Sequence, residues 1–152
     1  TDARCTEVQT YIQSGNVVFN ATAAVTRTLS TEVQAQIRRR FKLEVPVIIR
    51  TAAQLKAVWA NNPFLKRGGD ESRLHVMFLA DKPSPKMVAE LDPARSTPDE
   101  FIVKGAEIYL HLPNGTARSK LTNQYFDSRL RTVSTLRNWR TVLKLLELTQ
   151  SA

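Results

Sequence analysis

Cysteine, histidine and long apolar runs are what this chain has least of. Among its 152 residues it holds one cysteine, Cys5, and two histidines. A single cysteine excludes an internal disulfide and a cysteine-rich zinc site. No apolar run approaches the roughly 18–20 residues that span a bilayer, and the opening residues lack the basic-then-apolar pattern of a secretory signal. We therefore expect a soluble, cytoplasmic protein that does not enter a membrane.

Recognisable catalytic and metal-binding patterns are missing as well. His75 and His111 both fall in predicted strands, and neither has a cysteine or carboxylate at a metal-ligand spacing. No serine, histidine and acid follow an order that forms a triad, and no close pair of carboxylates indicates acid–base work. The sequence therefore predicts no metal and no cofactor, and it leaves open whether the protein is an enzyme.

What the chain does have is enough apolar residues for a core and an uneven excess of positive charge. Hydrophobic residues make up 42% of the sequence, which at this length supports one domain or two small, tightly packed halves. The net charge is +8, and residues 116–152 are strongly basic whereas residues 63–115 are nearly neutral. This asymmetry suits a partner that bears phosphate or carboxylate, although a basic surface that only keeps the protein soluble explains it at least as well.

Hydrophobic patterning predicts short strands and amphipathic helices along the whole chain. Gly15 separates two β-rich stretches and predicts a hairpin. Thr31 with Gln34, and Thr51 with Gln54, match the capping box that starts a helix, and residues 21–29 read as a polar connection. The predicted strands are 8–13, 16–20, 45–50, 73–80, 101–103 and 107–112, and the predicted helices begin at Thr31, Thr51 and Ser84, near residue 120 and at Asn138.

This order of elements predicts an α+β fold. Because hairpins alternate with helices, the sheet is expected to be largely antiparallel. The near-continuous apolar run over 73–80 places that strand at the centre of its sheet. Both halves of the chain show a hairpin followed by a helix.

Several sequence blocks, taken together and in order, resemble a bacterial family known only as domain of unknown function 1697. The resemblance spans the chain from about Glu7 to Leu148. Each block is short, and it is their order that is specific. The blocks are YIQSGNVVF at 11–19, PVIIRT at 46–51, NPF at 62–64, HVMFL at 75–79, YLHLP at 109–113, RSKL at 118–121 and RNWRT at 137–141.

The resemblance implies a duplicated ferredoxin-like architecture, with helices packed on mainly antiparallel sheets. On that basis residues 1–62 are expected to form the first half and residues 63–152 the second half with a C-terminal helix. Members of the family usually begin with a further strand and helix, so the first half is expected to be incomplete at its N-terminus. The family implies no established reaction.

The first candidate site is a loop that enters a helix at residues 114–122. A helix N-terminus presents free N–H groups and partial positive charge to an anion. Arg118 can clamp an anion with two hydrogen bonds, Lys120 adds a point charge, and Ser119 and Thr122 offer hydroxyl groups. The spacing is not that of a P-loop. The alternative is a capped loop whose basic residues only face water.

The second candidate group lies in the RNWRT block. Arg137 and Arg140 are candidate ligands for the same phosphate- or carboxylate-bearing small molecule. Trp139 has apolar residues three, four and seven positions further on, so the helical pattern places it in the core.

A third group, Gln13, Ser14 and Asn16, has amide and hydroxyl groups at the hairpin turn. These groups can line a pocket, or they can satisfy the backbone of the turn.

Three functions follow from these residues. The first is a small-anion or phosphorylated-metabolite binding domain. The second is a nucleic-acid-binding module, in which bases stack on the strand residues Tyr11, Phe19, Tyr109 and His111. The third is a protein-interaction or oligomerisation domain that uses a sheet edge or the last helix. The sequence leaves the oligomeric state open.

Overall fold

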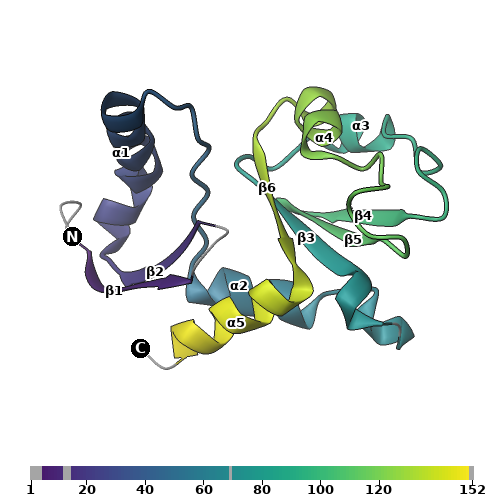
Figure 1. Ribbon diagram of the computed structural model, residues 1–152, viewed down its shortest axis with the longest axis horizontal. Helices are drawn as coiled ribbons and strands as arrows, with labels where there is room; N and C mark the ends of the chain where they lie inside the picture. Colours follow the sequence, from purple (N-terminus) through teal and green to yellow (C-terminus); the bar gives the residue numbers. More distant parts are fainter. Residues whose placement is uncertain (1–4, 12–14, 69, 151–152) are drawn as a thin grey trace.

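The computed structural model describes residues 5–11, 15–68 and 70–150 of the chain. Figure 1 shows two groups of elements, a hairpin with one long helix and a larger sheet with helices on both faces. The elements, in chain order, are β1 (Thr6–Tyr11), β2 (Asn16–Asn20), α1 (Ala23–Phe41), α2 (Ala52–Ala60), the 3-10 turns Leu65–Arg67 and Glu71–Arg73, β3 (Leu74–Leu79), α3 (Pro85–Ala89), β4 (Glu100–Lys104), β5 (Glu107–His111), α4 (Asn123–Leu130), β6 (Ser134–Asn138) and α5 (Trp139–Gln150).

The predicted hairpin is confirmed. β1 and β2 pair antiparallel, with Thr10 opposite Val17. Gly15, which directly precedes β2, has a φ of 73°, a left-handed conformation that costs glycine nothing. Gln13 and Ser14, two of the three residues proposed for a pocket at this turn, lie outside the described residues.

The first helix starts earlier than the capping box at Thr31 predicted. α1 begins at Ala23, and the hydroxyl oxygen of Thr22 accepts the N–H of Val25 at its start. The prediction of a polar connection over residues 21–29 is therefore wrong. Val25 and Leu29 are buried within this stretch, and a continuous helix buries them on one face. Thr31 lies in the middle of the helix, where a capping pattern has no free N–H to bind.

The strand predicted at 45–50 is also wrong. Residues 42–50 form no helix and pair with no strand among the described residues. They run as a stretched chain from the end of α1 down to α2 (Figure 1). A β-rich composition makes a strand only where a neighbouring strand bonds to it, and none lies alongside here.

The larger sheet is antiparallel throughout and has the strand order β4-β5-β3-β6. β3 lies inside it, as its apolar run predicted. The hairpin of β4 and β5 is confirmed as well. β6 was not predicted, because its sequence, STLRN, is too polar to signal a strand; it becomes one by pairing with β3.

Helices cover both faces of this sheet. On one face α2 and α5 pack against the even-numbered residues of β3, and on the other α3 and α4 pack against the odd-numbered ones. The first core is built around Leu55, Val58, Leu74, Val76, Phe78, Tyr109, Trp139 and Val142. The second is built around Met77, Leu79, Ile108, Leu110, Tyr125, Phe126 and Leu130.

The fold is thus α+β with two antiparallel sheets, as expected. Residues 74–138 follow the order β-α-β-β-α-β. Within the described ranges, none of the helices has the length and apolar content to cross a membrane.

Candidate functional site

The loop that carries Arg118 to Thr122 is held by hydrogen bonds to a second loop, residues 92–99. The backbone N–H of Lys120 donates to Ser96 Oγ at 2.9 Å, and that hydroxyl donates to the buried carboxylate of Asp99 at 2.8 Å. Ser119 Oγ accepts the N–H of Leu121 at 3.0 Å. Thr122 Oγ1 accepts the N–H of Tyr125 at 3.2 Å and so caps α4. The hydroxyl oxygens of Ser119 and Thr122 therefore accept hydrogen bonds from nearby backbone N–H groups.

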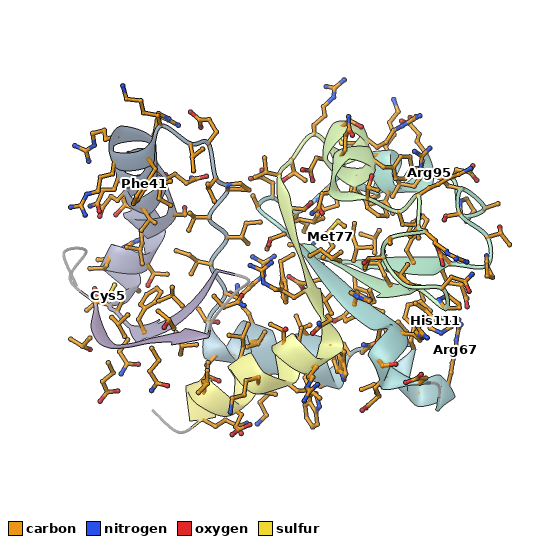
Figure 2. All side chains as sticks on the ribbon, in the orientation of Figure 1. Cys5, Phe41, Arg67, Met77, Arg95 and His111 are labelled. Carbon is orange, nitrogen blue, oxygen red and sulfur yellow. The ribbon has the colours of Figure 1, made fainter. Side chains whose placement is uncertain are left out.

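Arg95 joins this loop from the other side and was not singled out from the sequence. Its Nε donates to the carbonyl oxygen of Lys120 at 3.0 Å, and its guanidinium carbon lies 4.0 Å from the centroid of the Tyr125 ring. Arg129 lies 5.7 Å from the same ring centroid. Figure 2 shows Arg95 at the end of the fold where α4 lies. A guanidinium fixed by a ring and a carbonyl is pre-organised for a ligand, because fewer rotations are lost on binding.

Tyr125 itself is fixed by the core. Its side chain is buried, its ring contacts that of Phe126 edge-on at 5.1 Å, and its hydroxyl oxygen accepts the backbone N–H of Asp92 at 3.1 Å. Arg95 and Arg129 lie over the Tyr125 ring, and Arg118 and Lys120 belong to the loop to which Arg95 is bonded; we call these four cations together with Tyr125 the Tyr125 surface. A spacing of four residues between Tyr125 and Arg129 on a helix could have revealed that pair. No sequence signal links Tyr125 to Arg95.

Among the residues that the structure describes, the cations of the Tyr125 surface have no acidic partners. All four are exposed, and none forms an ion pair within the described residues. The two carboxylates of the 92–99 loop are already engaged, Asp92 with the N–H of Ala94 and Asp99 with Ser96. The surface therefore presents uncompensated positive charge.

Arg67 provides an instructive contrast. Its guanidinium also stacks on an aromatic ring, that of Phe64 at 4.9 Å. However, its Nη1 lies 2.8 Å from the Glu100 carboxylate, and His111 approaches the same carboxylate at 3.7 Å. The hydrogen bond from Arg67 is the main reason that the pKa of Glu100 lies below its ordinary value. Here the positive charge is neutralised within the protein, as it is not at Arg95.

The side chain of Arg137 is half-buried and makes its hydrogen bonds within the protein. Its Nε donates to Asn16 Oδ1 at 2.7 Å, and its Nη1 donates to Thr135 Oγ1 at 2.6 Å and to the carbonyl of Leu136 at 2.9 Å. Burial lowers the pKa of Arg137 from its ordinary value. The structure thus brings together two sequence candidates from different groups, Arg137 and Asn16, and their bond links the hairpin to β6.

Arg140 lies apart from the Tyr125 surface. It is exposed in the first turn of α5, whose N-terminus is capped by Asn138 Oδ1 accepting the N–H of Thr141 at 2.8 Å. Trp139 is 1% exposed, as predicted for a core residue. α5 packs on one face of the sheet and α4 on the other, so the structure does not unite Arg137 and Arg140 with Arg118 to Thr122.

The strand aromatics proposed for stacking bases are not exposed on the larger sheet. Tyr109 is 2% exposed, and its hydroxyl donates to the carbonyl of Val58 at 3.1 Å. Burial raises the pKa of this phenol to about 12. His111 is engaged with Glu100 and with the ring of Phe64 at 5.9 Å. In the hairpin, Phe19 is half-buried, and the side chain of Tyr11 lies outside what is described.

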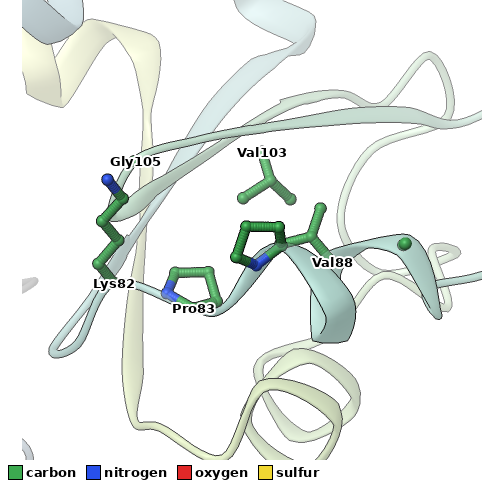
Figure 3. Close-up of a pocket in the computed structure, with 7 residues that line it drawn as sticks. Lys82, Pro83, Val88, Val103 and Gly105 are labelled. Atoms are coloured by element: carbon green, nitrogen blue, oxygen red, sulfur yellow. The ribbon is translucent and has the colours of Figure 1, made fainter.

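Neither hollows nor metal sites among the described residues provide a second candidate functional site. The part of the chain that is described holds no group of three or more histidine, cysteine, aspartate or glutamate residues that could bind a metal ion. A shallow hollow of about 330 Å³ lies between α3 and the β4–β5 hairpin (Figure 3). Its lining is mostly apolar and offers no catalytic group: Lys82, Pro83, Pro85, Val88, Ala89, Val103 and Gly105.

Comparison with known proteins gives one finding. The sequence model of a family described as Protein of unknown function (DUF1697) matches residues 1–109. The match includes Arg95 and ends before Arg118. The comparison with curated proteins and that with solved structures found no match to the chain.

Proposed function

We propose that this chain, which belongs to the DUF1697 family, binds a small anion at the Tyr125 surface. The observation that carries this proposal is the way in which the Arg95 guanidinium is held. Its guanidinium is held 4.0 Å over Tyr125 and bonded through Nε to the Lys120 carbonyl, and its two terminal nitrogens form no hydrogen bond with the described residues. Two parallel N–H groups are the geometry that guanidinium offers to phosphate or carboxylate.

Neighbouring charges favour the same ligand class. Lys120 and Arg118 lie on the loop to which Arg95 is bonded, and Arg129 flanks the same ring. An anion with two or more charges gains from several cations at once, because each exposed cation alone contributes little in water. The ligand is therefore a phosphorylated or polycarboxylated small molecule. Among the described residues of this surface, no hydroxyl group is hydrogen-bonded to a side chain that could act as its base, so the proposal is one of binding.

Nucleic acid also carries phosphate groups, and because the chain has a net positive charge, nucleic acid is the second candidate ligand. The two sources differ in how binding depends on salt. A nucleic acid that contacts several cations releases condensed counterions, so its affinity falls steeply as the salt concentration rises. A small anion responds less steeply, through screening alone.

The experiment is a calorimetric titration of the protein with inorganic pyrophosphate and, separately, with citrate. Arg95→Ala removes the held guanidinium and is expected to weaken binding by at least about tenfold, the worth of one charge-assisted hydrogen bond. The matched control is Arg67→Ala, which removes another ring-stacked arginine whose charge is already neutralised by Glu100. The control is expected to bind as the unaltered protein does.

Three outcomes contradict the proposal. One is the absence of binding at low salt for both anions. Another is equal weakening by Arg95→Ala and Arg67→Ala, which indicates a general effect of net charge. The third is binding only to a labelled oligonucleotide, with a steep salt dependence that flattens in Arg95→Ala, which makes nucleic acid the ligand.

The fold proposal is a pair of ferredoxin-like halves, residues 1–62 and 63–152. For the second half, the support is the β-α-β-β-α-β order and the antiparallel strand order β4-β5-β3-β6. For the first, the support is the hairpin of β1 and β2 followed by α1, whereas α2, at the end of this range, packs on the sheet of the second half. The single cysteine suits a reducing compartment, and we keep the bacterial cytoplasm as its location.

A further inference from the structure

β4 forms an open edge of the larger sheet. It is bonded to β5 along one side, and among the described residues no strand lies along its other side. Because Lys104 and Glu107 flank a two-residue turn, they are a hydrogen-bonded pair, and every second residue of β4 from there bonds to β5. The main-chain N–H and C=O groups of Phe101 and Val103, the residues in between, therefore point into the open edge. β4 contains no proline, so neither donor is lost.

The opposite edge of the same sheet is partly covered. β6 forms that edge, and the guanidinium of Arg137 on this strand donates to Asn16 Oδ1 of the hairpin at 2.7 Å. Figure 1 shows β6 on the side of the hairpin and β4 on the side away from it. β4 is therefore the edge that a second molecule can reach.

Space for a side chain is left beside β4 on one face of the sheet. The hollow of about 330 Å³ has Val103 and Gly105 in its sheet wall and Val88 in its α3 wall (Figure 3). Val103 shares this face with Phe101, whose ring packs edge-on against that of Phe126 at 5.2 Å. An apolar side chain from a strand added to β4 can therefore be buried next to Val103, which favours association.

The residues of β4 complement a second copy of the same strand. The sequence is EFIVK, with an acid at one end, a base at the other and apolar residues between them. In an antiparallel pair centred on Ile102, Glu100 of each copy lies opposite Lys104 of the other, and Phe101 lies opposite Val103. Opposite charges that face each other directly stabilise a pair of strands, and like charges destabilise it. A parallel pair in register would instead place like charges together at both ends.

The hydrogen-bonding positions fall in the same register. In an antiparallel pair, two facing residues whose main-chain groups point at each other exchange both N–H···O bonds. Centring the pair on Ile102 brings Phe101 of each copy opposite Val103 of the other, and these are the residues whose groups point into the open edge. A slip of one residue would place them opposite residues already bonded to β5. Main chain and side chains therefore select the same antiparallel pairing.

Glu100 and Lys104 are able to pair across this edge. Lys104 is exposed, and its Nζ donates to the carbonyl oxygen of Asn61 at 3.3 Å rather than to an acid. The side chain of Glu100 is 47% exposed and pairs with Arg67 through one carboxylate oxygen. The other oxygen lies 3.7 Å from His111 Nδ1, which is longer than a hydrogen bond. That oxygen can accept a further donor, and Lys104 of a second copy supplies one.

We propose that β4 is the interface of a homodimer. Two copies pair through this strand in antiparallel order, about a two-fold axis at Ile102, and join their larger sheets into one. The partner is a second copy because the strand complements its own reverse in both charge and hydrogen-bonding positions. β4 has five residues, so the interface is small and the dimer weak, with a Kd on the order of 10–100 µM. None of the cations of the Tyr125 surface lies in β4, so the dimer does not depend on anion binding.

The test is sedimentation velocity of the unaltered protein from about 1 µM to about 1 mM, near physiological ionic strength. A monomer is expected at the low end and a dimer at the high end. Lys104→Glu places like charges across both ends of the pair, as does Glu100→Lys, and each is expected to weaken the dimer by at least about tenfold. The matched control, Lys56→Glu, makes the same change of charge at an exposed position on α2 and is expected to dimerise within about threefold of the unaltered protein.

Mixing the two charge variants tests the register itself. Lys104→Glu leaves an edge with acids at both ends, and Glu100→Lys leaves an edge with bases at both ends. Each variant alone repels its own copy, whereas one of each restores two pairs of opposite charges. The mixture is therefore expected to associate at least about tenfold more tightly than either variant alone.

A further pair of variants tests the main-chain bonds. Val103→Pro removes an N–H that points into the open edge, where an edge strand tolerates proline, and is expected to weaken the dimer by at least about tenfold. Val103→Thr keeps the N–H and a similar shape and is expected to dimerise within about threefold of the unaltered protein. In the unaltered protein, amide exchange of Phe101 and Val103 is expected to slow as the concentration rises, while that of β6 stays the same.

Several results overturn the proposal. A protein that stays monomeric up to about 1 mM does so, as does a dimer that keeps its affinity in Val103→Pro or in both charge variants, since its interface then lies elsewhere. A mixture of the charge variants that remains monomeric, although circular dichroism shows both to be folded, overturns the register. Assemblies larger than a dimer contradict the two-fold axis.

Discussion

Replacing Arg50 with alanine is expected to lower the free energy of unfolding by about 3–5 kcal/mol. Arg50 ends the segment 42–50 and clamps it to the larger sheet. Its Nη2 donates to the carbonyls of Leu79 and Ala106 at 2.8 and 3.0 Å, and its Nε lies 2.9 Å from the Glu107 carboxylate. The side chains of Arg50 and Glu107 are only 14% and 19% exposed.

The magnitude follows from what the truncation leaves behind. The truncation leaves the Glu107 carboxylate without its cation and removes one donor from each of the Leu79 and Ala106 carbonyls, of which Ala106 keeps the N–H of Leu79 at 2.9 Å. Each group left without a partner in this mostly buried place costs about 1–3 kcal/mol. The losses overlap because one guanidinium serves all three groups, so the total stays below their sum. Arg50→Lys keeps the charge but not the planar fork, and is expected to cost about 1–2 kcal/mol.

The assay is equilibrium unfolding in urea for the unaltered protein, Arg50→Ala, Glu107→Ala and the double variant. The double variant is expected to be less destabilised than the sum of the single ones, with a coupling free energy of about 1–3 kcal/mol. A loss below about 1 kcal/mol for Arg50→Ala, or additivity within about 0.5 kcal/mol, refutes the reasoning that Arg50 clamps the sheet.

Three further predictions concern buried polar groups. Tyr109→Phe is expected to cost about 1 kcal/mol at neutral pH; because the phenol pKa is raised from 10 to about 12, the unaltered protein loses stability as pH rises through this range, and the variant should lose less in urea unfolding. Burial lowers the pKa of His75, so stability is lost as pH falls below 6.5; His75→Gln should flatten that loss between pH 7.5 and 5, and an unchanged slope contradicts it. Arg137→Met removes the bond to Asn16 Oδ1 and should speed hydrogen exchange in β2, whereas equal protection argues against the link.

The sequence predicted the helix starts that are fixed by hydrogen bonds between residues close together in the chain. The capping box of Thr51 and Gln54 is present in both directions, at 3.1 and 2.8 Å. Ser84 caps α3 and Asn138 caps α5, as expected. A cap joins residues two or three positions apart, so the sequence contains both partners of the bond.

Elements that depend on distant partners were predicted less well. β6 is a strand because β3 lies beside it and bonds to it. Residues 45–50 have a β-rich composition, but no described strand lies beside them, so they stay unpaired. At the candidate site, the basic loop at 118–122 could be seen in the sequence. Arg95 and Tyr125 meet across the fold, and a contact between residues 30 positions apart leaves no periodic pattern.

The most direct test of the central claim is a ¹H–¹⁵N NMR titration of the unaltered protein with inorganic pyrophosphate. The account predicts that amide signals of the 92–99 loop, the 118–122 loop and α4 shift together along one saturation curve, while those of β1, β2 and α5 stay in place. Shifts that instead follow the basic end of α1 at residues 38–42, or no shifts at all at low salt, contradict anion binding at the Tyr125 surface.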